Sequence, residues 1–197
     1  MKFTKAFFVM CLIVIAATPA WSQRGQGLRN GARNGGGNCL LLQSPATAQP
    51  LSTAEEEHLM LLREEEKLAR DAYQALYAKW GVRIFNNIAA SEQRHFDAVG
   101  ILIERYGLTD PAQPTAGVFA NPDLQQLNSD LIAKGNVSLL DALQVGVAIE
   151  EKDIEDLKAA MAITNNKDVL RVYSNLLNGS LNHLAAFNSH IDAVSSK

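Results

Sequence analysis

The sequence predicts an all-α protein, a four-helix bundle with one long crossover that carries a short extra helix. From residue 52 onward, apolar residues recur at steps of three, four and seven, the spacing of one helix face. Proline is absent from residues 51–110 and 123–197, and aromatic residues make up only 7% of the chain. Two helix pairs with short turns are separated by residues 107–137, enough chain to travel the length of a bundle.

The first 22 residues have the pattern of a signal peptide. Lys2 and Lys5 precede an apolar run over residues 6–17, and mostly small residues follow to residue 22. We therefore expect residues 1–22 to be removed and the protein to be periplasmic or secreted. The alternative, an uncleaved anchor, has too short a run to span a bilayer comfortably. No stable membrane span is expected after cleavage.

Residues 23–51 are expected to form a flexible linker that contains glycine, arginine and proline. Its first part, residues 23–38, holds six glycines, three arginines and almost nothing apolar. Pro45 and Pro50 keep the rest extended. Cys39 is the one cysteine left after cleavage, and it either cross-links two chains or lies buried near Leu40.

The first helical hairpin is predicted over residues 52–106. Ser52 and Glu55 have the spacing of a capping box at the start of the first helix, and Gly81 ends that helix. The second helix begins near residue 84 and ends before Gly107. Because about three residues join the two helices, they must be antiparallel neighbours.

The crossover and the second hairpin complete one domain over residues 52–197. Pro122 suits the first position of a short helix that Gly135 ends, and Asn136 or Ser138 caps the helix that follows. The other predicted elements are a loop at 108–121, a turn at 165–166 and a last helix at 168–194. The helix before that turn is predicted to end near residue 163.

Each long helix carries an ionisable residue where its apolar stripe should continue. These residues are Glu66 on the first helix, Glu92 and His95 on the second, Glu150 on the third and His183 on the fourth. Each lies a similar number of residues from its tight turn. At a rise of about 1.5 Å per residue, this places them at similar heights along the bundle axis. They should therefore meet in one layer at the middle of the bundle.

Carboxylates and imidazoles in an apolar layer are unfavourable unless they are paired or bind metal. A carboxylate di-metal site in a bundle takes one Glu from each of two helices and a Glu-x-x-His pair from each of the other two. The order Glu66, Glu92-x-x-His95, Glu150 and His183 fits this scheme with one ligand missing. We therefore expect two metal ions, iron or manganese, which suit these ligands.

The missing ligand is a glutamate, because Ser180 stands three residues before His183. Asp153 lies three residues after Glu150, at the edge of the same stripe. We expect Asp153 either beside the site, where it could replace the missing carboxylate, or at the surface, and we include it among the candidate metal ligands. The site should then be asymmetric, with weaker binding on the His183 side.

Four segments carry a resemblance to known proteins: EEEKLARDAY, NIAASEQRH, IEEKDIEDL and NLLNGSLNHLAAF. The first two are similar to motifs of the ferritin-like superfamily and of rubrerythrin-like proteins within it. All four are similar to domain-of-unknown-function family 2202, over about residues 55–190. The resemblance implies a ferritin-like fold and a metal site, while the activity of that family is not established.

A di-metal centre would suit ferrous oxidation or peroxide reduction, in oxidative-stress or iron handling. The chain has no rubredoxin-like Cys₄ module, so turnover would need an external electron donor. With 18 Lys and Arg against 21 Asp and Glu, the net charge of −3 argues against a nucleic-acid partner. The oligomeric state stays open, with a homodimer as one alternative.

The alternative function is that of a metal-free helical bundle acting as a protein-binding or structural module. Arg70, Arg94 and Lys67 would then neutralise the buried acids. In the acidic run Glu64–Glu66, we expect only Glu66 to point inward and its two neighbours to remain solvated, because consecutive helical residues face different directions.

Overall fold

The computed structural model describes residues 49–196, and this part of the chain is helical apart from its turns and loops. Its helices are α1 (Thr53–Trp80), α2 (Arg83–Arg105), α3 (Pro122–Gly135), α4 (Leu139–Ile163) and α5 (Lys167–Ser195). The predicted all-α fold is confirmed. The predicted signal peptide at 1–22, Cys39 and most of the predicted linker at 23–51 lie outside the described residues.

The helix boundaries follow from their capping residues. The Ser52 hydroxyl accepts the backbone N–H of Glu55, whose carboxylate accepts the Ser52 N–H, so the predicted capping box is present. Gly81 ends α1 at a φ of 67°, in the left-handed region that favours glycine. Ser138 caps α4 with its hydroxyl, whereas Asn136 closes α3.

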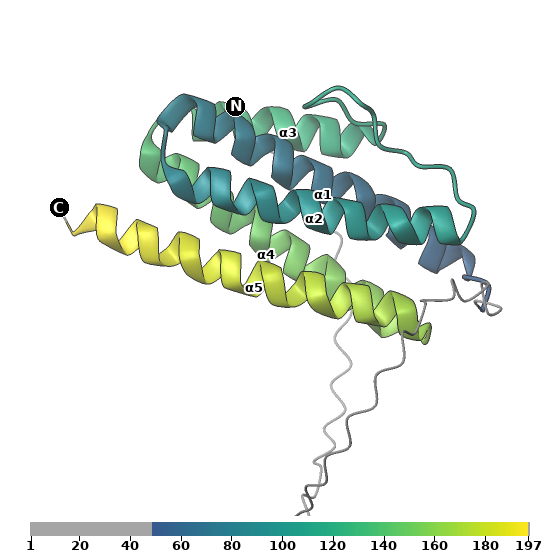
Figure 1. Ribbon diagram of the computed structural model, residues 1–197. Coiled ribbons are helices and arrows are strands. Elements are labelled where there is room, and N and C mark those ends of the chain that lie inside the picture. The colour runs from purple at the N-terminus through teal and green to yellow at the C-terminus, as the bar shows by residue number, and fades with distance from the viewer. Residues whose placement is uncertain (1–48, 197) are drawn as a thin grey trace, which may run out of the picture. The chain divides into compact units, whose positions relative to one another are not determined.

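The four long helices form two hairpins that pack against each other (Figure 1). One hairpin is α1 with α2, and the other is α4 with α5; α1 packs on α4 and α2 packs on α5. The long connection from α2 to α4 carries α3, which packs against α1 and α4. Among the described helices, none has both the length and the apolar character of a membrane span.

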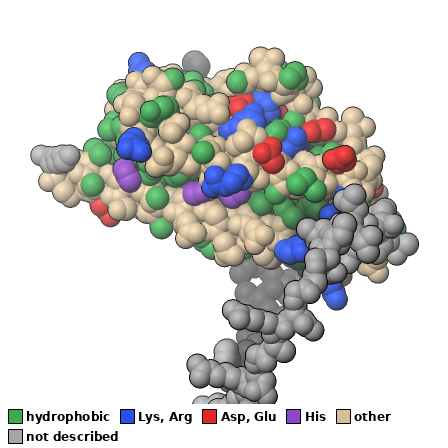
Figure 2. All heavy atoms as spheres, viewed as in Figure 1, with side chains coloured by type: hydrophobic (Ala, Val, Ile, Leu, Met, Phe, Trp, Pro, Cys, Tyr) green, Lys and Arg blue, Asp and Glu red, His purple; other side chains and the backbone are tan. Residues whose placement is uncertain are grey.

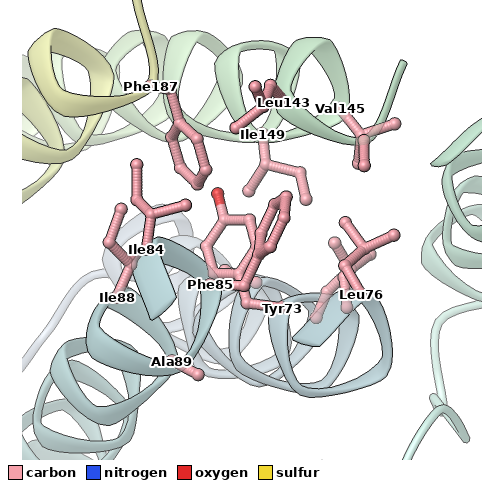
Figure 3. Close-up of a cluster of buried hydrophobic side chains, with 14 of the residues drawn as sticks. Tyr73, Leu76, Ile84, Phe85, Ile88, Ala89, Leu143, Val145, Ile149 and Phe187 are labelled. Carbon is pink, nitrogen blue, oxygen red and sulfur yellow. The ribbon is translucent and has the colours of Figure 1, made fainter. Parts of the chain in front are cut away.

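Two apolar clusters fill the core, and a polar layer separates them. The first cluster includes Tyr73, Leu76, Phe85, Leu143 and Phe187 (Figure 3), and the second includes Leu59, Leu62, Val99, Leu157 and Leu176. Along α1, the chain passes from the second cluster through Glu66 to the first, and along α5 it passes through Ser180 and His183. The predicted polar positions therefore lie at one level, with apolar packing on both sides.

The acidic run of α1 is buried throughout, so the expectation that Glu64 and Glu65 remain solvated is wrong. Glu64 faces the crossover, where its carboxylate accepts the backbone N–H groups of Ala120 at 2.6 Å and Asn121 at 3.0 Å. Glu65 faces α4, where it pairs with Lys152 at 3.3 Å. A pattern within one helix does not reveal that a loop and a second helix cover its other faces.

A buried ion pair on α1 holds the crossover. Lys67 Nζ donates to Asp71 at 2.6 Å and to the carbonyl oxygen of Thr115 at 2.9 Å. Asp71 also accepts the backbone N–H of Gly117 at 2.9 Å. The side chains of Lys67 and Asp71 are 1% and 3% exposed, so each depends on the other for charge compensation.

Candidate metal centre

The polar layer collects side chains from all four long helices. Glu66 comes from α1, Glu92 and His95 from α2, Glu150 from α4 and His183 from α5. The three glutamates are 1–2% exposed as residues, and the two histidine side chains are 11–12% exposed. The structure therefore brings together these five sequence-predicted site residues.

The layer contains two groups of potential ligand atoms, and Glu92 belongs to both. In the first group, His95 Nδ1 lies 2.8 Å from Glu92 Oε2 and 3.4 Å from Glu66 Oε2. In the second, His183 Nδ1 lies 2.8 Å from Glu92 Oε1 and 3.5 Å from Glu150 Oε2. Within each group, one ligand atom from every residue lies within 4.8 Å of the others. One carboxylate thus faces two imidazoles with its two oxygens.

Several of these atoms are buried without a hydrogen-bond partner in the described part of the chain. They are Glu66 Oε1, Glu92 Oε1, His95 Nδ1 and His183 Nδ1, and Asp153 Oδ1, outside the two groups, is likewise buried without a partner. Leaving a buried polar atom unpaired costs about 1–3 kcal/mol, and more when it is charged. These atoms approach one another closely without hydrogen-bond alignment, an arrangement that a cation between them would satisfy.

Comparison with known proteins identifies the family of this chain. The family model described as "Uncharacterized protein domain (DUF2202)" matches residues 55–196. The chain belongs to this family. It is 51% identical over 140 residues to the uncharacterized protein MJ0754 of Methanocaldococcus jannaschii, a match that covers 71% of this chain and 76% of that protein.

A solved structure is also similar to the DUF2202 domain described above. The crystal structure of hypothetical protein MJ0754 from Methanococcus jannaschii DSM 2661 aligns with a TM-score of 0.73 at 48% identity. The alignment covers 75% of this chain and 85% of that one. The family assignment and this likeness support the fold, and they leave the function to be argued from the site.

Burial and the closeness of several carboxylates make negative charge unfavourable on part of the polar layer of this DUF2202 domain. Burial raises the pKa of Glu66 well above its usual range, and the carboxylates of Asp153 and Glu92 raise it further. Burial also raises the pKa of Glu150 to about 7, although the nearby His183 opposes the shift. The layer therefore favours either protons or cations beside these oxygens.

Glu92 and the histidines behave in the opposite way. Burial alone would raise the pKa of Glu92, but its close contacts with His183 and His95 outweigh burial and lower it to about 2. Burial alone would lower the pKa of His183, but Glu150 and Glu92 outweigh it and raise the pKa to about 9. The raised pKa values of the two histidines favour positive charge on the imidazoles beside the central carboxylate.

Asp153 points into the layer, so the alternative that placed it at the surface is wrong. Its Oδ2 lies 2.5 Å from the hydroxyl of Ser180, and its Oδ1 is buried without a hydrogen-bond partner. Burial raises the pKa of Asp153 to about 6. Asp153 is not a member of either three-residue group, yet it occupies the space beside Ser180, where the sequence lacks a glutamate.

Tyr73 positions one of the candidate ligands. Its hydroxyl donates to Glu150 Oε1 at 2.7 Å, and its ring packs against Phe187 with the centroids 5.3 Å apart. Figure 3 shows the Tyr73 oxygen pointing from α1 towards α4 and α5, among apolar side chains. The hydrogen bond occupies one oxygen of Glu150 and leaves the other directed at His183.

The cations expected to neutralise the acids in a metal-free bundle lie elsewhere, so that expectation is wrong. Lys67 pairs with Asp71, and Arg70 donates to Asp71 and to Gln93. Arg94 donates to the Ala90 carbonyl and to Ser91 on its own helix. Among the described residues, the layer's four carboxylates therefore face only the two imidazoles as potential positive partners.

The histidines lie at the seam between α2 and α5. Their rings stack with centroids 5.6 Å apart. Figure 2 views the side of the bundle where α2 and α5 lie in front, and histidine side chains reach the surface there beside a Lys or Arg side chain. The layer is thus separated from solvent on this side by little more than the edges of its imidazoles.

Gly179 makes room for His95 at this seam. A Cβ atom at Gly179 would lie 2.6 Å from both Cε1 and Nε2 of the His95 ring, closer than any normal contact. Replacing Gly179 by Ala is therefore expected to displace His95 and to lower the metal content of the first group. Gly146→Ala is the control, because its Cβ would instead meet Phe187 at 2.5 Å, in the apolar cluster.

Metal analysis and urea denaturation of both glycine variants would separate a loss of site geometry from a loss of packing. We expect Gly179→Ala to lose metal with a modest loss of stability, and Gly146→Ala to lose stability with its metal content retained. Equal metal content in Gly179→Ala and the unmodified protein would contradict this role for Gly179.

A charged cluster next to the layer was not predicted from the sequence. Glu65, Lys152 and Asp156 lie between α1 and α4, and Lys152 contacts both carboxylates. Burial and the nearby Asp156 raise the pKa of Glu65 to about 8, although Lys152 opposes the shift. The hydrophobic pattern does not distinguish these residues, because they lie off the apolar stripes and resemble ordinary charged residues at a surface.

Proposed function

We propose that this protein binds two divalent metal ions, iron or manganese, in the polar layer of its bundle. Glu66, Glu92 and His95 would hold one ion, and Glu92, Glu150 and His183 would hold the other, with Glu92 as the bridging carboxylate. The observation that carries this proposal is the set of buried, converging nitrogen and oxygen atoms without hydrogen-bond partners.

The donor set and its charge support this choice of ions. Carboxylate oxygens and imidazole nitrogens suit iron and manganese, and no thiolate belongs to either group. When ionised, Glu66, Glu92, Glu150 and Asp153 carry four negative charges, which two divalent cations would balance. Two cations would also relieve the repulsion that raises the pKa of Glu66.

The chemistry that such a pair of ions supplies is activation of dioxygen or peroxide, which fits ferrous oxidation or peroxide reduction in oxidative-stress or iron handling. The apolar clusters on both sides would exclude water from the layer. Tyr73 would hold Glu150 in position through its hydrogen bond. Reduction would need an external electron donor.

The resemblance to ferritin-like proteins supports the same class of function. The proposal includes a periplasmic or secreted location, which rests on the sequence of residues 1–22 alone. Elemental analysis of the purified protein after anaerobic reconstitution tests the core of the proposal. About two equivalents of iron or manganese are expected, and the absence of bound metal would reject it.

Changing His95 to Ala is expected to lower the metal content from about two equivalents to about one. The reason is that His95 belongs to only one of the two groups. Metal analysis would measure the change, and circular dichroism would confirm that the helices remain. His190→Ala is the matched control, since His190 is exposed on α5 and its ring hydrogen-bonds to the carbonyl of Ala186, away from the centre. Full metal content in His95→Ala would rule out this ligand.

Asp153 and Ser180 should make the two metal positions unequal. A glutamate at position 180 would supply a second bridging carboxylate, whereas the present Ser180 orients Asp153 in its place. We expect Asp153→Asn to weaken the more weakly held ion by about tenfold or more. We expect Ser180→Glu to tighten that ion, if its longer side chain takes the position of Asp153.

Anaerobic titration with Fe²⁺ or Mn²⁺ resolves the two affinities in each variant. Glu151→Gln, a charge change on the exposed side of α4, should leave both affinities unchanged. Two equal and tight sites in the unmodified protein that Asp153→Asn leaves unchanged would refute the asymmetry.

A further inference from the structure

A second charged cluster lies on the seam between α1 and α4, directly beside the candidate metal centre. Lys152 Nζ is 3.3 Å from Glu65 Oε1, and it also contacts the carboxylate of Asp156. Glu65 is the neighbour of Glu66 on α1, and Asp156 lies three residues after Asp153 on α4. The cluster therefore adjoins the layer from two helices at once.

Its carboxylates are not satisfied by Lys152 alone. The side chain of Glu65 is 9% exposed, and its Oε2 is buried without a hydrogen-bond partner. One ammonium group faces two carboxylates, so the cluster keeps a surplus of negative charge when both are ionised. A buried, unpaired carboxylate oxygen next to a second carboxylate is a ligand arrangement for a cation.

Carboxylates on α4 form a row from the solvent to the centre. Glu150, Asp153 and Asp156 are spaced three residues apart, which is about 4.5 Å along a helix for each step. Glu150 is 2% exposed, whereas Asp153 and Asp156 are both partly exposed, with the Asp156 side chain at 19%. Asp153, the middle member, has a buried Oδ1 without a hydrogen-bond partner.

Lys152 is positioned to block access from the solvent to this row of carboxylates. Its side chain is 48% exposed, so its ammonium group can leave the two carboxylates and enter water without repacking the core. A flexible four-carbon stem with a well-hydrated head suits such a movement. Along the bundle axis the centre is flanked by apolar clusters, through which a hydrated dication would pass only at a large desolvation penalty, and at the seam between α2 and α5 the two imidazoles cover it.

From this arrangement we infer an outer cation site, formed by Glu65 and Asp156, through which divalent metal ions reach the centre by way of Asp153. Lys152 occupies the outer site between transfers and moves aside for an arriving ion. This inference rests on the proposed metal-binding function, and it adds the route by which the two ions are acquired.

The rate of metal uptake tests the route separately from the affinity of the centre. The purified metal-free protein would be mixed with Mn²⁺ under anaerobic conditions, and the loss of the free-ion signal followed by freeze-quench electron paramagnetic resonance. Glu65→Gln and Asp156→Asn should each slow uptake about tenfold, because charge focusing at a binding cleft changes association rates by at least that factor. Lys152→Met should accelerate uptake.

All variants should still bind about two equivalents of Mn²⁺ at equilibrium. The slowing should shrink as ionic strength rises, since salt screens the surface part of the attraction. Glu155→Gln and Lys158→Met are the controls, because they remove the same charges from exposed positions of α4, and they should take up Mn²⁺ at the unmodified rate. Urea denaturation would confirm that each variant is folded.

The outcomes distinguish the route from the function on which it rests. If the unmodified protein binds no Mn²⁺, the proposed function fails. If it binds two equivalents and all variants take them up at one rate, the function stands and the route is overturned, which would leave the seam between α2 and α5 as the way in. If Lys152→Met slows uptake instead, Lys152 only joins α1 to α4, and the inference is likewise overturned.

Discussion

Changing Glu92 to Gln is expected to remove both metal ions from the centre. Its two carboxylate oxygens each lie 2.8 Å from a different histidine nitrogen, so it is the one residue shared by the two groups. Gln has the same shape but lacks the charge and one of the acceptor oxygens. Affinity at both positions should fall by on the order of 100-fold or more, since losing even an outer partner of a ligand lowers affinity 10–100-fold.

Metal analysis and Mn²⁺ titration of Glu92→Gln would measure this loss, and circular dichroism would verify the helices. Glu151→Gln provides a matched control, because Glu151 is exposed and follows the candidate ligand Glu150. The comparison with His95→Ala is also informative, since that variant should keep about one equivalent. Retention of one ion at its original affinity in Glu92→Gln would show that Glu92 does not bridge.

The largest loss of stability is expected from Asp71→Ala. Asp71 accepts hydrogen bonds from Lys67, Arg70 and the backbone of Gly117. Its removal would leave the Lys67 ammonium, with a side chain only 1% exposed, without a carboxylate partner. Breaking a buried ion pair from one side costs about 3–5 kcal/mol, a large part of the stability of a domain of this size.

Urea denaturation would measure the effect, with Asp97→Ala as the control. Asp97 is exposed and accepts a hydrogen bond from the side chain of Gln93, so its removal should change the free energy of unfolding by about 0.5 kcal/mol or less. Adding Lys67→Met to Asp71→Ala should recover part of the loss, because the buried charge is then gone. A loss of less than about 1 kcal/mol in Asp71→Ala would contradict the role of this ion pair.

The contribution of Asp71 should also depend on pH. Burial alone would raise its pKa, but hydrogen bonds from Lys67 and Gly117 outweigh burial and lower it. A lowered pKa in the folded state means that the stabilisation is present above the unfolded-state pKa of about 3.9 and is lost as the pH falls through the folded-state value. The difference in stability between Asp71→Ala and the unmodified protein should therefore narrow in acid.

Local sequence signals were sufficient to predict the helices and the residues that face the core. Ser52, Gly81 and Pro122 are capping or breaking residues whose effect depends on their immediate neighbours. Glu66 and Glu150 interrupt apolar stripes, and helical periodicity fixes which side of a helix such residues face. The short turns and the long connection then predicted that these polar residues lie at one level of the bundle. The apolar clusters on both sides of that level confirm this prediction.

Helical spacing fixes the side of its own helix on which each side chain lies, whereas the packing of the helices fixes which residues it contacts. Periodicity could not predict that Glu92 is shared by two histidines, or that Ser180 turns Asp153 inward from a neighbouring helix. Periodicity also predicted wrongly that Glu64 and Glu65 are solvated, whereas the crossover covers Glu64 and α4 covers Glu65. Contacts between helices depend on the rotation and separation of the helices and on the path of the loops, none of which the spacing within one helix specifies.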